Sequence, residues 1–321
     1  MTRKGNIRTK LLKMLGMLLP ALLLATPVMG DDTVPATGLK AAGKAQEQKE
    51  QNEKEKKKKL EGQQDDGTIT IMGQRMLKDG ELIGTYHQPM WSTARRFPNT
   101  RVYVLPAGSA TFEYWLITEG ELGTDKAASF RSNYELELGL GAHLQLDMYL
   151  FTEQAAGYAP LNLAGEQIEL RWAFADWGVI WGNPALYLEW VRRDEKPQKL
   201  EAKLLLGDMI TPRLFWGLNL VYERELGGES EGEYALSFGL AYALIDGVLS
   251  LGLEGKISLA DVNGARFDFA EKKFMFGPSL QVRPLPGVHL DLVPMFGAVI
   301  EDETEAAYAV YLIVGKEFSI W

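Results

Sequence analysis

The chain has 321 residues, a formal net charge of −9, no cysteine and three histidines. The absence of cysteine excludes disulfide bonds, thiolate metal sites and a cysteine nucleophile, and the scarcity of histidine argues against imidazole metal sites. The acidic balance argues against nucleic acid as a partner, because phosphate binding requires a basic surface.

Residues 1–30 have the pattern of a secretory signal peptide. Basic side chains are followed by a leucine-rich stretch over 11–25 and then by small residues up to Gly30. An N-terminal membrane anchor is the alternative, but Lys13 and Pro20 leave an apolar stretch shorter than the ~20 residues that a membrane-spanning helix needs. We expect cleavage after Gly30.

Residues 31–66 form a charged segment of low complexity. Leu39 and Leu60 are the only large apolar residues between positions 36 and 64, so no helical face could bury enough apolar surface to offset the cost of ordering. A solvated helix with Glu–Lys pairs is the alternative. We predict a disordered tether.

Residues 67–109 have a different composition, with a short predicted strand at Thr68–Ile71 and turn residues throughout the rest. Two interpretations of this irregular segment stay open. It is either a plug or latch that docks against acidic groups elsewhere, or a segment that closes one end of the following domain. The candidate plug or latch residues are Trp91, Arg95, Arg96 and Arg101.

From residue 110 onward the sequence repeatedly alternates between apolar and polar side chains, which is the pattern of strands with two unlike faces. In Tyr134–Leu140, for example, Glu135 and Glu137 lie on one face and the leucines on the other. We predict twelve strands, over 110–118, 132–140, 143–152, 163–175, 184–192, 198–207, 212–224, 232–244, 248–259, 273–283, 287–299 and 306–318.

Three features favour a transmembrane barrel over a soluble sandwich. Most predicted strands have nine to thirteen residues, whereas globular strands average about five to six and tilted membrane-spanning strands need about 9–11. The connections tend to alternate between tight turns and longer polar loops, and the apolar faces carry almost no charge but have aromatic residues near their ends. We therefore predict an all-β, antiparallel barrel of about twelve strands over 110–321, in contact with the lipid of a Gram-negative-type outer membrane.

Two stretches near the C-terminus resemble known outer-membrane proteins. Residues Gly315–Ile320 are similar to the C-terminal signal of bacterial outer-membrane barrels, which implies insertion by the barrel assembly machinery. Residues 277–297 resemble the penultimate hairpin of transporter barrels of the phenol-degradation (MetA-pathway) type, with a GPS-like strand, a proline-containing turn and an H-x-D-L strand. That resemblance covers the last quarter of the chain and implies transport of small compounds, hydrophobic ones among them.

The polar faces of the predicted strands carry charges of both signs with an acidic excess. The candidate lumen-lining residues are Glu135, Glu137, Asp147, Glu169, Arg171, Glu201, Lys203, Glu223, Glu254, Lys256, Arg283, His289 and Asp291. They could form a network of paired charges that fills the barrel, or a wet polar channel. Eight-stranded barrels have filled interiors and those with 16–18 strands have open pores, so a count of twelve strands does not distinguish a filled lumen from an open channel. An open lumen with an acidic excess would favour cations.

We expect an outer-membrane channel or transporter for small solutes, without a cofactor, a metal ion or catalytic residues. The alternative is a structural barrel with a filled lumen whose tether reaches peptidoglycan or a periplasmic partner. An embedded hydrolase ranks third. It would need a histidine beside its catalytic partner, and the candidate pairs, His143 with Asp147 and His289 with Asp291, both lie next to predicted short turns.

Overall fold

The computed structural model describes residues 76–124, 128–154, 162–228, 230–261 and 267–320. The predicted signal peptide, the tether over 31–66 and the strand at Thr68–Ile71 lie outside the described residues. In the part of the chain that is described, no helix is long and apolar enough to cross a membrane.

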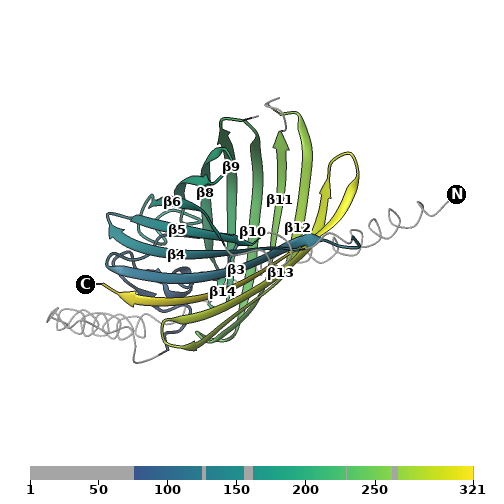
Figure 1. Cartoon of the computed structure of the whole chain (residues 1–321). Helices are drawn as coiled ribbons and strands as arrows, with labels where there is room; N and C mark the ends of the chain where they lie inside the picture. The colour runs from purple at the N-terminus through teal and green to yellow at the C-terminus, as the bar shows by residue number, and fades with distance from the viewer. Residues whose placement is uncertain (1–75, 125–127, 155–161, 229, 262–266, 321) are drawn as a thin grey trace, which may run out of the picture. The chain divides into compact units, whose positions relative to one another are not determined.

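Twelve antiparallel strands form a closed barrel in which each strand pairs with its neighbours in the sequence, and the last strand pairs with the first (Figure 1). This architecture confirms the predicted fold class. The strands are β3 (Ser109–Glu121), β4 (Ser129–Gly141), β5 (Leu144–Gln154), β6 (Asn162–Ala173), β7 (Ala185–Arg193), β8 (Gln198–Thr211), β9 (Leu214–Leu226), β10 (Gly232–Ile245), β11 (Leu249–Asp261), β12 (Phe269–Leu285), β13 (Val288–Ile300) and β14 (Thr304–Ser319).

The alternation of the sequence becomes an apolar outer surface and a polar interior. On the outside, Leu138, Leu146, Leu170 and Leu188 stand in register across β4 to β7. On the inside, the residues that alternate with these leucines along each strand, such as Glu137, Asp147 and Glu169, are buried and mostly charged. A closed barrel with this distribution satisfies its backbone hydrogen bonds internally and presents apolar side chains outward, as membrane-spanning strands require.

An arginine on this outer surface should destabilise the barrel in lipid according to its depth. Leu188 is 48% exposed in the middle of β7, so we expect Leu188→Arg to reduce the free energy of unfolding in lipid vesicles by about 2–4 kcal/mol. Leu226 is as exposed but ends β9, so Leu226→Arg should cost about 0–1 kcal/mol. Equal losses in urea titrations of the two variants would contradict this placement of the lipid-facing belt.

The two ends of the barrel differ in their connections. We call one the short-turn end, because four of its connections have two or three residues and only 174–184 is longer. The other is the long-loop end, with connections at 122–128, 155–161, 194–197, 227–231, 262–268 and 301–303. The start of β3 and the end of β14 pair with each other, Ser109 with Ser319, at the short-turn end.

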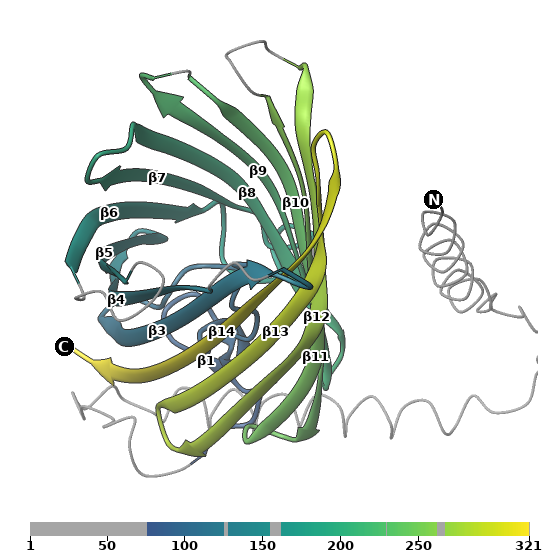
Figure 2. The ribbon, with the colours of Figure 1, turned by 45° about the vertical axis from the view of Figure 1, so that its right-hand side comes forward.

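Residues 76–108, which we call the inner segment, lie within the ring of strands (Figure 2). The segment contains two short paired strands, β1 (Leu82–Ile83) and β2 (Gln88–Pro89), and a 3-10 turn, η2 (Met90–Ser92). Trp91 and Phe97 are fully buried in a cluster with Phe215 and other apolar side chains of the barrel wall. The ring of Trp91 stacks on that of Phe215, with centroids 4.9 Å apart.

A row of glycines makes room for the inner segment. Gly207, Gly217 and Gly239 are paired in register across β8, β9 and β10. Val102 packs against Gly207, and a Cβ atom placed on Gly239 would lie 2.5 Å from the Phe97 ring. Because real Cβ atoms do not approach other atoms so closely, the seat of the inner segment depends on the absence of side chains from this row.

Candidate functional site

The short turns of the barrel hold the first part of the inner segment. The backbone N–H of Asp79 donates to Asp246 Oδ1 (2.8 Å), and the N–H of Gly247 donates back to Asp79 Oδ2 (2.9 Å). The N–H of His143 donates to the Tyr86 hydroxyl (2.9 Å). Asp79 also pairs with Arg96, so the chain is fixed where it passes into the lumen.

Arg95 lies at the centre of a buried cluster of carboxylates. Its Nη2 is 2.7 Å from Glu135 Oε1 and 2.5 Å from Glu137 Oε1, and its Nε pairs with Glu113. Glu113 and Glu135 are cross-strand neighbours on β3 and β4, which explains why one guanidinium reaches both. The Trp115 indole N–H donates to both of these carboxylates (3.0 and 2.9 Å), and its ring lies 4.6 Å from the Arg95 guanidinium.

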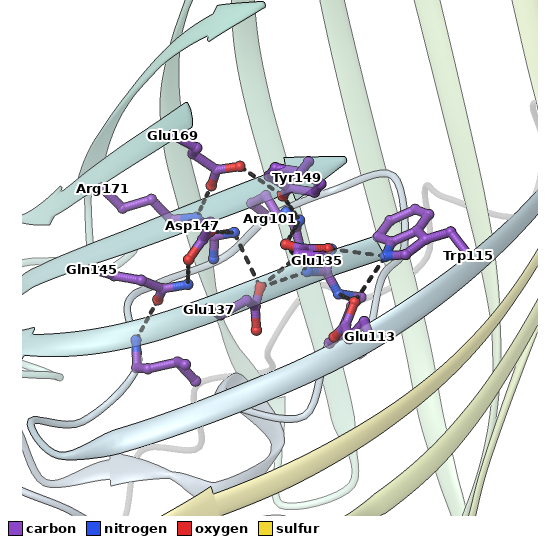
Figure 3. Close-up of polar contacts among 12 residues, drawn as sticks. Arg101, Glu113, Trp115, Glu135, Glu137, Gln145, Asp147, Tyr149, Glu169 and Arg171 are labelled. Carbon is purple, nitrogen blue, oxygen red and sulfur yellow. Dashed lines mark hydrogen bonds and ion pairs between the residues drawn. The ribbon is translucent and has the colours of Figure 1, made fainter. Parts of the chain in front are cut away.

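Arg101 extends this cluster toward β5 and β6 (Figure 3). Its Nη2 donates to Glu135 Oε1 (2.8 Å) and to the Tyr149 hydroxyl (2.6 Å), which in turn donates to Glu169 Oε2 (2.8 Å). Burial alone would lower the pKa of the Arg101 guanidinium, but Tyr149, Glu135 and the neighbouring carboxylates outweigh burial and raise the pKa well above its ordinary range. Arg101 therefore carries a permanent positive charge inside the barrel.

Three carboxylates of the cluster are close enough together to hold a metal ion. Oxygen atoms of Glu135, Asp147 and Glu169 all lie within 4.8 Å of one another. Each of these carboxylates, however, already pairs with a guanidinium. Arg101 contacts Glu135, and Arg171 contacts Asp147 at 2.7 Å and also pairs with Glu169. The arrangement is that of an ion-pair network whose carboxylates are occupied by arginines rather than that of a metal centre.

The barrel wall also satisfies the backbone of the inner segment, most of which has no regular secondary structure. Asn219 accepts from the N–H of Arg101 (2.9 Å) and donates to its carbonyl (2.6 Å). The side chain of Gln145 accepts a hydrogen bond from the N–H of Leu105, and the side chain of Glu254 accepts one from the N–H of Asn99. The side chain of Gln281 donates a hydrogen bond to the carbonyl of Ala94. Such contacts matter because buried backbone groups without partners are costly.

Above the inner segment, on its long-loop side, the lumen contains a cavity of about 250 Å³, which we call the vestibule. Pro98, Asn99 and Arg101 form its base. Its walls come from ten strands and carry the aromatic side chains Trp115, Tyr149, Tyr187 and Tyr311 beside charged and amide groups. At the level of the inner segment, a pocket between the segment and the wall measures about 30 Å³. That is room for roughly two water molecules.

No protein-family model and no curated protein sequence matches the chain. Among solved structures it is similar to an outer membrane channel from Pseudomonas putida F1, with 11% identity over 68% of this chain and 98% of that chain and a TM-score of 0.48. It is also similar to the NanC porin (9%, 63% and 98%, TM-score 0.46) and the KdgM porin (8%, 63% and 97%, TM-score 0.42). At these values we transfer neither function nor substrate, and the resemblance to phenol-degradation transporters stays a prediction.

The structure places the thirteen candidate lumen-lining residues on the inner side of the barrel but divides them into groups. Glu135, Glu137, Asp147, Glu169 and Arg171 belong to the cluster around the inner segment. Nearer the long-loop end, Lys203 pairs with Glu201, Lys256 with Glu233, and Glu223 with Lys199. Arg283 pairs with Glu317 at the short-turn end.

The two histidine pairs have different outcomes. His289 is buried, with Nδ1 2.6 Å from Asp291 Oδ2 and Nε2 3.4 Å from Glu113. The candidate pair of His143 with Asp147 does not form, because β5 begins only at Leu144 and His143 lies in the preceding turn, where it contacts Asp176 at 2.7 Å. His289 thus faces carboxylates with both of its ring nitrogens, whereas His143 faces one with its Nε2.

Sequence reasoning missed Glu113 and Trp115. Both lie in the run Ala110–Ile117, which is so rich in large apolar and aromatic residues that its alternation is weak. The signal was present nevertheless, because Thr111, Glu113 and Trp115 share one face of the strand, and all three are buried in the lumen. Extending the two-residue alternation of the neighbouring strand to this one would have assigned Glu113 and Trp115 to the lumen face.

Proposed function

We propose that this protein is an outer-membrane channel or transporter for small solutes, with the inner segment as its plug. The observation that carries this proposal is the vestibule, a polar cavity of about 250 Å³ whose base is formed by Pro98, Asn99 and Arg101 of the inner segment.

The inner segment adds no strand to the barrel sheet. Its β1 and β2 pair only with each other, and the twelve-stranded barrel is closed without them. Apart from a few backbone hydrogen bonds at the rim, such as that from Gly108 to Gly139, the contacts between segment and wall are ion pairs, side-chain hydrogen bonds and apolar packing. Removal of the segment would therefore break no strand pairing, which is what a removable plug requires.

Outer-membrane barrels place their short turns in the periplasm and their longer loops outside. With that orientation, the inner segment is inserted from the periplasmic side, and the vestibule lies toward the external side. The predicted signal peptide, cleaved after Gly30, would deliver the chain to the periplasm, and the predicted tether over 31–66 would remain there.

The alternative is a structural barrel anchored to peptidoglycan or a periplasmic partner through the tether. It is favoured by the dense apolar packing around Trp91, which has no exposed surface. Conductance distinguishes the two functions, because a permanently filled barrel passes no ions.

The test is planar-bilayer conductance of the mature chain, residues 31–321, beside a variant that lacks residues 31–108. We expect rare or small steps from the mature chain and large, steady steps from the variant. Loss of Arg95 and Arg101 leaves the lumen carboxylates with fewer cations, so the variant should prefer cations. A variant lacking only 31–66 should behave like the mature chain. Complete silence from the mature chain would favour the structural alternative, and silence from the plug-free variant, with β-type circular dichroism intact, would reject a pore through this barrel.

A further inference from the structure

The charge of the vestibule differs from that of the lumen as a whole. Around the inner segment, five carboxylates pair with the three arginines Arg95, Arg101 and Arg171. The charged residues that line the vestibule are mainly basic. They are Arg101, Arg131, Lys203 and Lys256, against Glu189 and Glu201.

One of these basic residues is unpaired. Arg101, Lys203 and Lys256 each have a carboxylate partner at 2.8 Å or less. Arg131 makes no ion pair or hydrogen bond with any other residue in the described ranges, and its buried Nε has no partner. Glu153 is its cross-strand neighbour on β5, but the two side chains form no ion pair. Arg131 thus presents a free guanidinium to the vestibule.

A second unsatisfied group stands beside it. Asn133 is two residues further along the same face of β4, lines the vestibule and is only 8% exposed. Its side-chain Oδ1 has no hydrogen-bond partner. A buried polar atom without a partner is destabilising, so a solute that supplies a hydroxyl group here would relieve that cost.

Further positive charge lies close by on β7. Arg193 also has a buried Nε without a partner, and its guanidinium is 5.4 Å from the ring of Phe151. Phe151 is the cross-strand neighbour of Asn133. The ring of Phe151 therefore lies between the guanidinium of Arg193 and the side-chain amide of Asn133. Two arginines without a carboxylate partner among the described residues therefore flank an unsatisfied amide.

We infer that the vestibule binds a small hydroxylated monocarboxylate. Its carboxylate pairs with Arg131, one of its hydroxyl groups bonds to Asn133, and its carbon chain lies against the aromatic walls. Guanidinium groups suit carboxylates because they donate two parallel hydrogen bonds. The volume of about 250 Å³ is below the ~300–1,000 Å³ of pockets that hold drug-sized ligands, which limits the solute to a small one. This inference rests on the proposed function, since it names the solute class that the channel would admit.

The test uses isothermal titration calorimetry of the mature chain in detergent, with gluconate as the probe. Glucose has hydroxyl groups without the charge, and acetate has the charge without hydroxyl groups, so both should bind more weakly than gluconate. We expect Arg131→Gln to weaken gluconate binding roughly 10–100-fold, because a charge-assisted hydrogen bond is lost. Asn133→Asp, which keeps the size but adds a like charge, should weaken it as well.

Arg192→Gln is the matched control, because Arg192 is the half-exposed neighbour of Arg193 on the opposite face of β7 and pairs with Glu166. It should bind gluconate like the parent protein. Absence of gluconate binding, equal affinity in the Arg131→Gln and Arg192→Gln variants, or equal binding of glucose and gluconate would each overturn the inference. Because binding is measured without conduction, gluconate binding by a barrel that never conducts would leave this site intact and reject only the channel.

Discussion

Replacement of Arg95 by methionine is expected to release the inner segment from the lumen and to raise the conductance of the mature chain toward that of the plug-free variant. Arg95 is the shared cation of Glu113, Glu135 and Glu137, and all four side chains are at most 4% exposed. Removal of one partner from a buried ion pair costs about 3–5 kcal/mol, because the remaining charge stays buried without compensation. Methionine keeps much of the volume, so the loss is mainly electrostatic.

The control for Arg95 is an arginine whose ion pair is exposed. Arg192 and Glu166 are 43% and 41% exposed, so Arg192→Met should change stability by no more than about 1 kcal/mol and leave the conductance unchanged. Glu113 has Arg95 as its guanidinium partner, so adding Glu113→Gln to Arg95→Met removes the carboxylate left without one and should recover part of the closed state. The measurement is open probability together with protease cleavage within 76–108. An Arg95→Met barrel that stays closed and protected would show that packing alone retains the segment.

Gly239→Leu is expected to displace the inner segment from the lumen by a steric route. A Cβ atom at this position would lie 2.5 Å from the Phe97 ring, and Phe97 is buried against a wall that cannot move without breaking strand pairs. The inner segment is held by side-chain contacts rather than by a ladder, so it should move before the barrel does. We expect a larger conductance and new protease cleavage within 76–108, with the β-type circular dichroism of the parent protein.

The double variant Gly239→Leu with Phe97→Ala supplies the matched test. Alanine vacates the space that leucine occupies, so the segment should seat again and the conductance should fall. If the double variant conducts as freely as Gly239→Leu alone, the effect of the leucine does not pass through Phe97, and the role assigned to the glycine row is wrong.

The barrel could be predicted from the sequence because its information is local. In a strand such as Tyr134–Leu140, seven residues are enough to show which side chains are apolar and which are polar. The number and approximate bounds of the strands follow because this alternation recurs along the chain. The direction of the charged side chains followed from the same period. His143 shows where local reasoning fails, since a shift of one residue at a strand end moved it from the lumen to a turn with positive φ.

The inner segment could not be placed from the sequence, because its contacts join residues far apart. Arg95 adopts a left-handed backbone conformation, with φ of 33°, that the neighbouring residues in the sequence do not predict. The partners of its guanidinium come from the barrel wall. The basic cluster near Trp91 indicated only that a plug was one of two options. Likewise, Gly217 and Gly239 read in sequence as ordinary strand glycines, and their meaning depends on the side chains that the inner segment brings to them.

The direct connection between the inner segment and β3 makes this segment a covalently attached ligand of its own barrel. Residues 106–108 lead straight into β3, and the N–H of Gly108 donates to the carbonyl of Gly139 (2.9 Å) at the rim. A released segment would therefore stay at an effective concentration on the order of millimolar, as short linkers provide. Closure can then dominate at equilibrium even if the segment binds its seat only weakly, and each opening ends with recapture by the same barrel rather than with loss of the plug.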